Sequence, residues 1–298
     1  MTRDATKSEL LSPDFLARLE RLELVSRKVF RGRLKGERRS PRKGQSVEFA
    51  DYRNYVQGDD LRFIDWNTYA RLDRLFLKLF LEEEDLHFYT LIDNSVSMRF
   101  GDPTKLRYAK QVAAALGFIG LVRSDRVKVE SLGSSGRRRV PALRGRHNLA
   151  RLLETIETIE AEGDVSLADG VRRFCLHHEG RGILVLITDL LDKQGFEKPL
   201  RDLAAQRMDT YLIHTLSAEE LAPEFQGDLQ LVDCEDGDVA DITVSEPLLK
   251  RYRDTLEAFV ATARGFCSRR GIVYLLASNQ VPFERLVTSY LQNRGLVR

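Results

Sequence analysis

The sequence predicts an α/β protein with a doubly wound, largely parallel sheet. Three apolar runs, 86–92, 182–188 and 210–216, have the composition of strands that are buried on both faces. Stretches with apolar residues at helical spacing separate these runs, and such alternation indicates parallel strands joined by crossover helices. The first two runs each lead directly into a carboxylate, Asp93 and Asp189.

Residues 1–32 are expected to form an N-terminal helical extension. Ser12 and Pro13 are typical of a helix start, with the serine as the cap and the proline at the first helical position. Apolar residues then recur at helical spacing: Phe15, Leu16, Leu19, Leu22 and Val25. We expect this helix to pack on the main domain.

Residues 33–85 are expected to form a second, irregular segment that packs on the sheet. Glycine, charged and aromatic residues are dense from Gly44 to Arg71, and the periodicity fits neither a helix nor a strand. Side-chain hydrogen bonds and ion pairs usually hold such a segment together, so we interpret it as cross-bracing of the sheet. A second contact surface is the alternative. Trp66, the only tryptophan of the chain, is expected to be a packing anchor.

Residues 86–298 are expected to form the main domain, with the three runs above as central strands. Further strands are expected at 126–132 and 272–276. The segments 229–233 and 239–244 flank Asp236-Gly237, which is a strong signal for a small β-hairpin. Apolar periodicity and start signals predict the helices at 104–119, 149–159, 166–177, 195–207, 245–270 and 282–291.

Composition favours a reduced, soluble protein of ordinary globular character. The chain has 298 residues, 43% of them hydrophobic, and a net charge of only +2. Its three cysteines are far apart and odd in number, which argues against a disulfide framework and against a zinc site. No stretch approaches the roughly 18–20 apolar residues of a membrane span, and residues 1–8 lack the apolar core of a signal peptide. We therefore expect a cytoplasmic location and no transmembrane segment.

Positive charge is concentrated in the segment 27–43, which holds nine Lys and Arg against one acid. Its net charge of +8 leaves −6 for the rest of the chain. Such a segment can bind nucleic acid or an anionic surface. It can also be a solvated loop whose charges pair with acids such as Glu82–Asp85.

A cation site is predicted where the first and second apolar runs end. Asp93 is followed by Ser95 and Ser97, and this spacing offers one carboxylate and two hydroxyls to a Mg²⁺-like cation. Asp189 ends the second run, and the carboxyl ends of parallel strands meet at one edge of a sheet, where ligands bind. A cation between Asp93 and Asp189 would remove their mutual repulsion. The alternative is an ordinary Asp/Ser turn after a strand.

A set of residues between Gly36 and Met98 resembles a known bacterial family, the domain of unknown function numbered fifty-eight. Members of that family are similar to von Willebrand factor A domains. The resemblance covers roughly residues 33–295, and its specificity lies in Gly36, Ser40, Gly44, Glu48, Phe49, Arg53, Tyr55, Gly58, Asp59, Arg62, Ile64, Asp65, Trp66, Ala70, Arg71 and Lys78, followed by Asp93, Asn94, Ser95, Val96, Ser97 and Met98.

The resemblance implies a von Willebrand factor A-like fold, a metal-ion-dependent adhesion site and a neighbouring AAA+ ATPase of the MoxR type. The family's third contributor to the metal is usually a threonine in a loop before a helix, and this role passes to Ser166 here. Asp192 is a weaker additional candidate. The metal set implied is Asp93, Ser95, Ser97, Ser166 and Asp189, with Mg²⁺ as the cation and Mn²⁺ or Ca²⁺ as alternatives.

The function expected from this resemblance is a non-catalytic, metal-dependent protein-binding module. A partner protein would donate a carboxylate to the metal. The module would act with the MoxR-type ATPase in chaperone-like assembly or maturation of a client complex, with no small-molecule substrate.

Enzymatic functions find less support in the sequence. A haloacid-dehalogenase-like phosphatase needs a second acid two residues after Asp93, where Ser95 stands. There is neither a phosphate-binding P-loop motif nor a serine-hydrolase elbow. A metal-dependent hydrolase that uses Asp93 and Asp189 remains an alternative. Other reactive side chains are assigned structural places: His147, His177 and His178 at the surface or at helix caps, and Cys175 and Cys267 as small buried residues.

Overall fold

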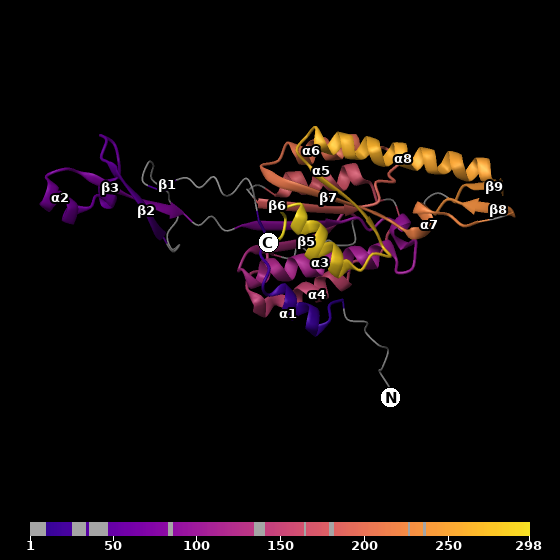
Figure 1. The fold of residues 1–298 in the computed structure, drawn as a ribbon, viewed down its shortest axis with the longest axis horizontal. Helices are drawn as coiled ribbons and strands as arrows, with labels where there is room; N and C mark the ends of the chain where they lie inside the picture. Colours follow the sequence, from indigo (N-terminus) through magenta and orange to yellow (C-terminus); the bar gives the residue numbers. More distant parts are fainter. Residues whose placement is uncertain are drawn as a thin grey trace, which may run out of the picture. The chain divides into compact units, whose positions relative to one another are not determined.

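In the computed structural model the chain forms two compact units. The structure describes residues 10–25, 34–35, 47–82, 86–133, 141–163, 165–178, 182–225, 227–234 and 237–298. One unit comprises Met1–Ser26 and Leu86–Arg298, and the other comprises Arg27–Asp85 (Figure 1). The expected packing of residues 33–85 on the sheet stays a prediction.

The main unit is built on five parallel strands in the order β10–β7–β6–β4–β5. Leu143 adds an antiparallel bridge to Val127 at the β5 edge. This order confirms the predicted doubly wound, von Willebrand factor A-like α/β fold. The bounds of the strands are β4 His87–Ile92, β5 Arg126–Ser131, β6 Gly182–Thr188, β7 Met208–Leu216 and β10 Val273–Ser278.

Helices cover both faces of this sheet and enclose two hydrophobic cores (Figure 1). In β4, Phe88 and Ile92 belong to one core and Tyr89 and Leu91 to the other, as the alternation of side chains along a strand requires. The first core includes residues of α1 (Pro13–Leu19), α3 (Lys105–Val122), α4 (Leu149–Glu157), α9 (Phe283–Arg285), the π-helical turn Leu286–Tyr290 and α10 (Leu291–Asn293). The second includes residues of α5 (Leu167–His177), α6 (Glu197–Ala204) and α8 (Glu246–Ser268).

The direction of winding reverses between β4 and β6. From β4 the chain crosses through α3 to β5 on one side, and from β5 it returns through α4 and α5 to β6 on the other side. Ligands of open α/β sheets bind outside the carboxyl ends of the strands at such a switch point. A ligand site is therefore expected at the ends of β4 and β6.

The N-terminal helix α1 packs on the main unit as predicted. The Ser12 hydroxyl accepts a hydrogen bond from the Phe15 N–H at 3.3 Å, which caps the helix. Phe15 and Leu19 are buried, and the Phe15 ring meets the edge of Phe283 at a centroid distance of 5.3 Å.

In its described residues the smaller unit is a three-stranded antiparallel sheet in the order β1–β3–β2 with a short helix, so the expectation of neither helix nor strand from Gly44 to Arg71 is wrong. Its small core contains Ile64, Leu77 and Leu79. The element bounds are β1 Leu34–Lys35, β2 Val47–Asn54, the 3₁₀ turn η1 Leu61–Phe63, α2 Trp66–Leu72 and β3 Phe76–Glu82.

The prediction that Trp66 anchors the packing is wrong, because 60% of this residue is exposed. Its neighbour Asp65 takes the interior position instead. The Asp65 carboxylate caps α2 by accepting from Asn67 N–H and Thr68 N–H, and it accepts from the Tyr52 hydroxyl at 2.9 Å. Trp66 then occupies the first position of the surface helix α2, where its ring makes an edge-to-face contact with Tyr69 at a centroid distance of 6.1 Å.

The predicted small β-hairpin is present. β8 (Gly227–Val232) pairs in antiparallel fashion with β9 (Val239–Val244), between the short helix α7 (Ala218–Leu221) and α8. Figure 1 shows it next to the start of α8.

Candidate functional site

Asp93 lies where the winding reverses and is held by two hydrogen bonds. It follows β4 directly and is 5% exposed. Its Oδ1 accepts from the Ser95 N–H at 3.0 Å, and its Oδ2 accepts from the Thr188 hydroxyl at 2.6 Å. Burial, followed by the nearby charge of Asp189, raises the pKa of Asp93 above its ordinary value. The buried Asp93 carboxyl is therefore protonated more readily than a surface aspartate.

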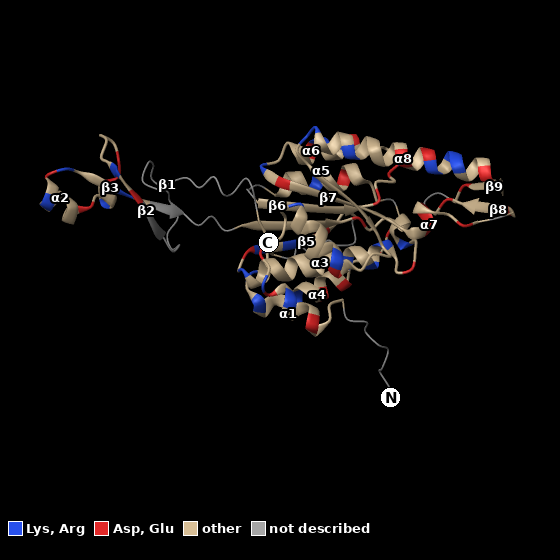
Figure 2. Cartoon of the chain, viewed as in Figure 1, with Lys and Arg blue, Asp and Glu red and all other residues tan. Residues whose placement is uncertain are grey.

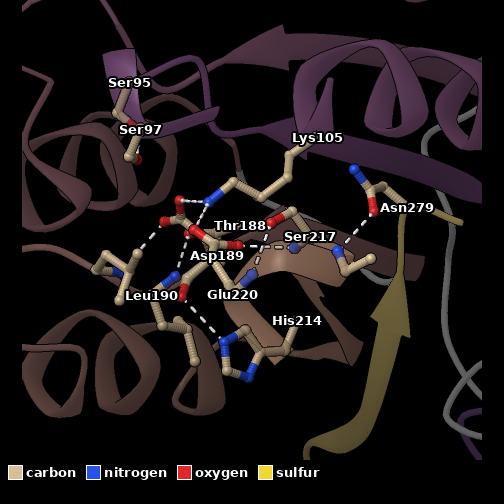
Figure 3. A network of polar contacts seen from close by, with 12 residues as sticks. Ser95, Ser97, Lys105, Thr188, Asp189, Leu190, His214, Ser217, Glu220 and Asn279 are labelled. Carbon is tan, nitrogen blue, oxygen red and sulfur yellow. Dashed lines mark hydrogen bonds and ion pairs between the residues drawn. The ribbon is translucent and has the colours of Figure 1, made fainter. Parts of the chain in front are cut away.

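Ser95 and Ser97 lie side by side in the turn after Asp93. Their hydroxyl oxygens are 2.9 Å apart, and both residues are less than 10% exposed (Figure 3). Asn94 holds this turn in place. Its side chain accepts a hydrogen bond from Gly133 N–H at 2.7 Å and donates one to the Glu160 carbonyl at 2.8 Å. The structure thus brings together three of the predicted ligands.

Asp189 lies at the end of β6, as predicted, but its charge is already paired with a buried lysine. Its Oδ2 is 2.7 Å from the Lys105 ammonium, which is also 2.6 Å from Glu220 Oε1 (Figure 3). Lys105 is 0% exposed. Leu190 adopts a left-handed backbone (φ 59°), and the turn allows the Leu191 N–H to donate to Asp189 Oδ1 at 3.2 Å.

Ser166 caps α5, and its hydroxyl accepts from Asp169 N–H at 3.3 Å. The segment before it reaches the loop after β4, because Glu162 N–H donates to the Asn94 carbonyl at 2.7 Å. The residue after it reaches the loop after β6, because Leu167 N–H donates to Asp192 Oδ2 at 2.7 Å. Ser166 therefore lies in the chain between Glu162, which contacts the loop after β4, and Leu167, which contacts the loop after β6.

The donor set fits a hard divalent cation. Asp93 contributes a carboxylate with raised pKa, and Ser95 and Ser97 contribute neutral oxygens next to it. A cation there would offset the like charges of Asp93 and Asp189. Among the described residues there is no cluster of three or more His, Cys, Asp or Glu able to hold a metal, so this site depends on hydroxyl ligands.

The other reactive side chains lie mostly where the sequence suggested. His147 and His177 are exposed and Cys267 is buried, whereas Cys175 is only half-buried. His178 is the C-cap of α5, as expected for a capping residue, but it is buried rather than at the surface. Its Nε2 lies 3.0 Å from Glu130 Oε1, which explains how a histidine is accommodated there.

The sequence did not predict two residues that contact Asp189, namely Lys105 and His214. Lys105 is the first residue of α3, where a cation interacts unfavourably with the helix dipole. This unfavourable position was the one local indication that Lys105 has an acidic partner. His214 lies inside a predicted buried strand; its Nε2 donates to the Asp189 carbonyl at 2.9 Å, and its Nδ1 accepts from the Tyr274 hydroxyl at 2.6 Å. Burial lowers the pKa of His214 to about 4, so the ring is neutral at pH 7.

Comparison with known proteins identifies the family. The model of a family described as "Protein of unknown function DUF58" matches residues 51–263 of this chain. The chain belongs to this family. A relative from Mycobacterium tuberculosis (strain H37Rv), described as uncharacterized, is 29% identical over 250 residues, covering 81% of this chain and 78% of the relative. A second, from Mycobacterium avium, is 34% identical over 116 residues, covering 37% of this chain and 66% of the relative.

Solved structures with a similar fold are remote. BatB from Bacteroides thetaiotaomicron is 13% identical and covers 70% of this chain and 98% of its own, with a TM-score of 0.42. A von Willebrand factor type A protein from Catenulispora acidiphila is 14% identical and covers 46% of this chain and 35% of its own, with a TM-score of 0.33. The strand order of this DUF58 member by itself defines its doubly wound fold. In the part of the chain described here, no helix is long and apolar enough to cross a membrane.

Proposed function

We propose that this DUF58 chain is a non-catalytic protein-binding module that contacts its partner through a divalent cation held at Asp93, Ser95 and Ser97. Mg²⁺ is the cation proposed, with Mn²⁺ and Ca²⁺ as alternatives. One observation carries the proposal: two buried carboxylates, Asp93 and Asp189, end adjacent strands at the switch point, beside two neighbouring hydroxyls.

Each residue has a distinct role in this proposal. Asp93 supplies the negative charge, and its orientation is fixed by Ser95 N–H and the Thr188 hydroxyl. Ser95 and Ser97 supply neutral oxygens. Ser166 is the further ligand that the family resemblance implies. When bound, the cation offers an open coordination position that a carboxylate of the partner can fill.

Lys105 limits the negative charge around this position. Because its ammonium pairs with Asp189, that carboxylate contributes less to the site than Asp93 does. Fewer uncompensated ligands leave a bound cation more attractive to an incoming acidic side chain. The same pairing makes a hydrolase that uses both Asp93 and Asp189 a weaker candidate, because Asp189 is no longer a free base.

The proposed partner system is a MoxR-type AAA+ ATPase, with which the module would assemble or mature a client complex. This part of the proposal rests on the family resemblance. The competing nucleic-acid or anionic-surface function depends on the basic segment 27–43, which lies outside the described residues except for Leu34–Lys35.

The test is a calorimetric titration of the full chain with Mg²⁺ and Mn²⁺, without and with acetate as a stand-in for the partner's carboxylate. We expect binding that disappears in Ser95→Ala/Ser97→Ala. The matched control, Ser268→Ala/Ser289→Ala, removes two exposed helical hydroxyls elsewhere and should bind normally. The proposal is refuted if the wild type binds neither ion even with acetate, or if the Ser95/Ser97 variant binds as well as the wild type.

A further inference from the structure

The β8–β9 hairpin has one apolar face and one mixed face. Its register pairs Leu229 with Ile242 and Leu231 with Ala240. Residues directly opposite one another in an antiparallel pair share a face, so these four apolar residues lie together. The register places Asp228, Gln230, Asp241 and Thr243 on the other face, which ends in an exposed apolar pair, Val232 and Val239.

The apolar face is left largely open. Leu231 is 48% exposed, Ala240 is exposed, and Leu229 and Ile242 are half-buried. None of the four belongs to a hydrophobic core of the described chain. A two-stranded sheet is only marginally stable by itself, and apolar surface kept exposed on one usually marks an interaction site.

The chain segment that contains the hairpin carries negative charge only. Between residues 217 and 249 the sequence has ten Asp and Glu and no Lys or Arg. Figure 2 shows acidic residues around α7, β8 and β9. On the mixed face, Asp228 accepts from the Thr243 hydroxyl at 2.6 Å and Asp241 accepts from the Gln230 amide at 3.0 Å. Both carboxylates thus bond neutral neighbours, which leaves their charge available to a cationic partner.

The hairpin lies beside the carboxyl edge of the main sheet. Asp233, just past β8, is 3.4 Å from Lys193, which lies in the loop that follows Asp189. At its base, α7 is tied to α8 because the Tyr252 hydroxyl donates to the Glu220 carbonyl at 2.8 Å. A protein docked on the hairpin would therefore also reach the loops at the end of β6.

We propose that this hairpin binds a basic, extended segment of a partner protein, which adds to the hairpin as a further strand. In the described chain the sheet has two strands, so each strand has one edge without a neighbour. A segment that alternates apolar with Lys or Arg residues would align its apolar side chains with Leu229 and Leu231. Its cations would fall on the face of Asp228 and Asp241.

Charge selects this occupant over the others. A second copy of the hairpin, an anionic lipid surface and a nucleic acid would each bring negative charge against the acidic residues, which is unfavourable. A basic segment reverses the sign of that interaction. This docking surface is separate from the proposed cation site and does not require it.

The direct test measures the fluorescence anisotropy of labelled nine-residue peptides with the full chain at low salt. The probe alternates Lys or Arg with Val or Leu. One control peptide carries Glu in place of the cations, and another has proline at the alternate positions, which prevents strand pairing. We expect binding of the basic peptide alone, weakened by added salt. Equal binding of the proline peptide would overturn strand addition, and binding of the Glu peptide would overturn the charge argument.

Variants locate the binding. Asp228→Lys/Asp241→Lys should weaken the basic peptide by about tenfold or more, given the strength of surface charge pairs. Asp228→Asn/Asp241→Asn can keep the cross-strand hydrogen bonds while it removes the charge, so it should also weaken binding even if the lysine variant disturbs the hairpin. The matched control is Glu154→Lys/Asp254→Lys, which changes the net charge equally at exposed positions on α4 and α8. An equal loss in this control would refute the hairpin as the site.

Two further measurements separate this proposal from the others. Chelator and Ser95→Ala/Ser97→Ala should leave peptide binding unchanged, so a loss with either would assign the peptide to the cation site. Hairpin-dependent self-association of the full chain, or hairpin-dependent binding of phosphatidylglycerol vesicles or duplex DNA, would show a different occupant and refute the proposal.

Discussion

Replacing Lys105 with methionine should destabilise the main unit strongly. The ammonium is completely buried and lies 2.7 Å from Asp189 and 2.6 Å from Glu220. Methionine retains most of the apolar stem, so the change removes the charge with little loss of packing. Asp189 then remains a buried carboxylate with no cation beside it.

The structure allows the magnitude to be bounded. Removing one partner of a buried ion pair costs about 3–5 kcal/mol, because the remaining charge has lost its compensation. The Asp189 side chain is 2% exposed and incurs this cost almost fully, whereas Glu220 at 17% is partly rehydrated. For a unit of this size, about 3–5 kcal/mol corresponds to a fall in melting temperature of roughly 6–20 °C.

Urea unfolding followed by circular dichroism at 222 nm measures this loss. Trp66 fluorescence is unsuitable as the probe because Trp66 belongs to the smaller unit. The double variant Lys105→Met/Asp189→Asn should recover a large part of the loss, since the buried charge is gone. Lys198→Met, at an exposed position on α6, is the control and should change stability by less than about 0.5 kcal/mol. A loss below about 1 kcal/mol in Lys105→Met, or no recovery in the double variant, would refute the reasoning.

Three other predictions follow from single contacts. Because the folded-state pKa of His214 lies near 4 instead of 6.5, its stabilising contribution is complete above pH 6.5 and is lost as the pH falls toward 4. The loss amounts to about 3 kcal/mol, and the free energy of unfolding of His214→Gln should vary less over this range. Gly182→Ala should cost about 1–3 kcal/mol in urea unfolding, because a Cβ would overlap the His87 carbonyl, while Gly163→Ala, with open space around it, should be near neutral. Trp66→Ala should change stability by less than about 0.5 kcal/mol by thermal melting, and a larger loss would restore Trp66 as a packing residue.

Much of the candidate site could be predicted because its signals are local. Asp93, Ser95 and Ser97 follow a buried strand within a few residues, and Asp189 ends another. Parallel strands place their carboxyl ends on one edge, so chain position alone brings Asp93 and Asp189 to the same region. The cap at Ser12 and the hairpin around Gly237 were equally local.

Contacts between distant residues could not be predicted in the same way. Lys105 and Asp189 are separated by 84 residues, and no periodicity relates them. The predicted burial of Trp66 was wrong. Large apolar side chains are usually buried, but here the buried position is occupied by the neighbouring Asp65, whose carboxylate caps α2. In such cases the partner, not the residue type, decides the environment.

By itself, the sequence determined the order of strands and helices along the main unit, the edge on which the acidic strand ends meet and the serine hydroxyls beside them. Periodicity and turn chemistry act within a few residues, and these features need nothing longer. Only the tertiary structure decided that a buried ammonium neutralises Asp189, that neutral His214 supports the Asp189 backbone, and that the hairpin presents an open apolar face. Those properties depend on which surfaces pack together, because burial sets both the strength of a charge pair and the exposure of an apolar side chain.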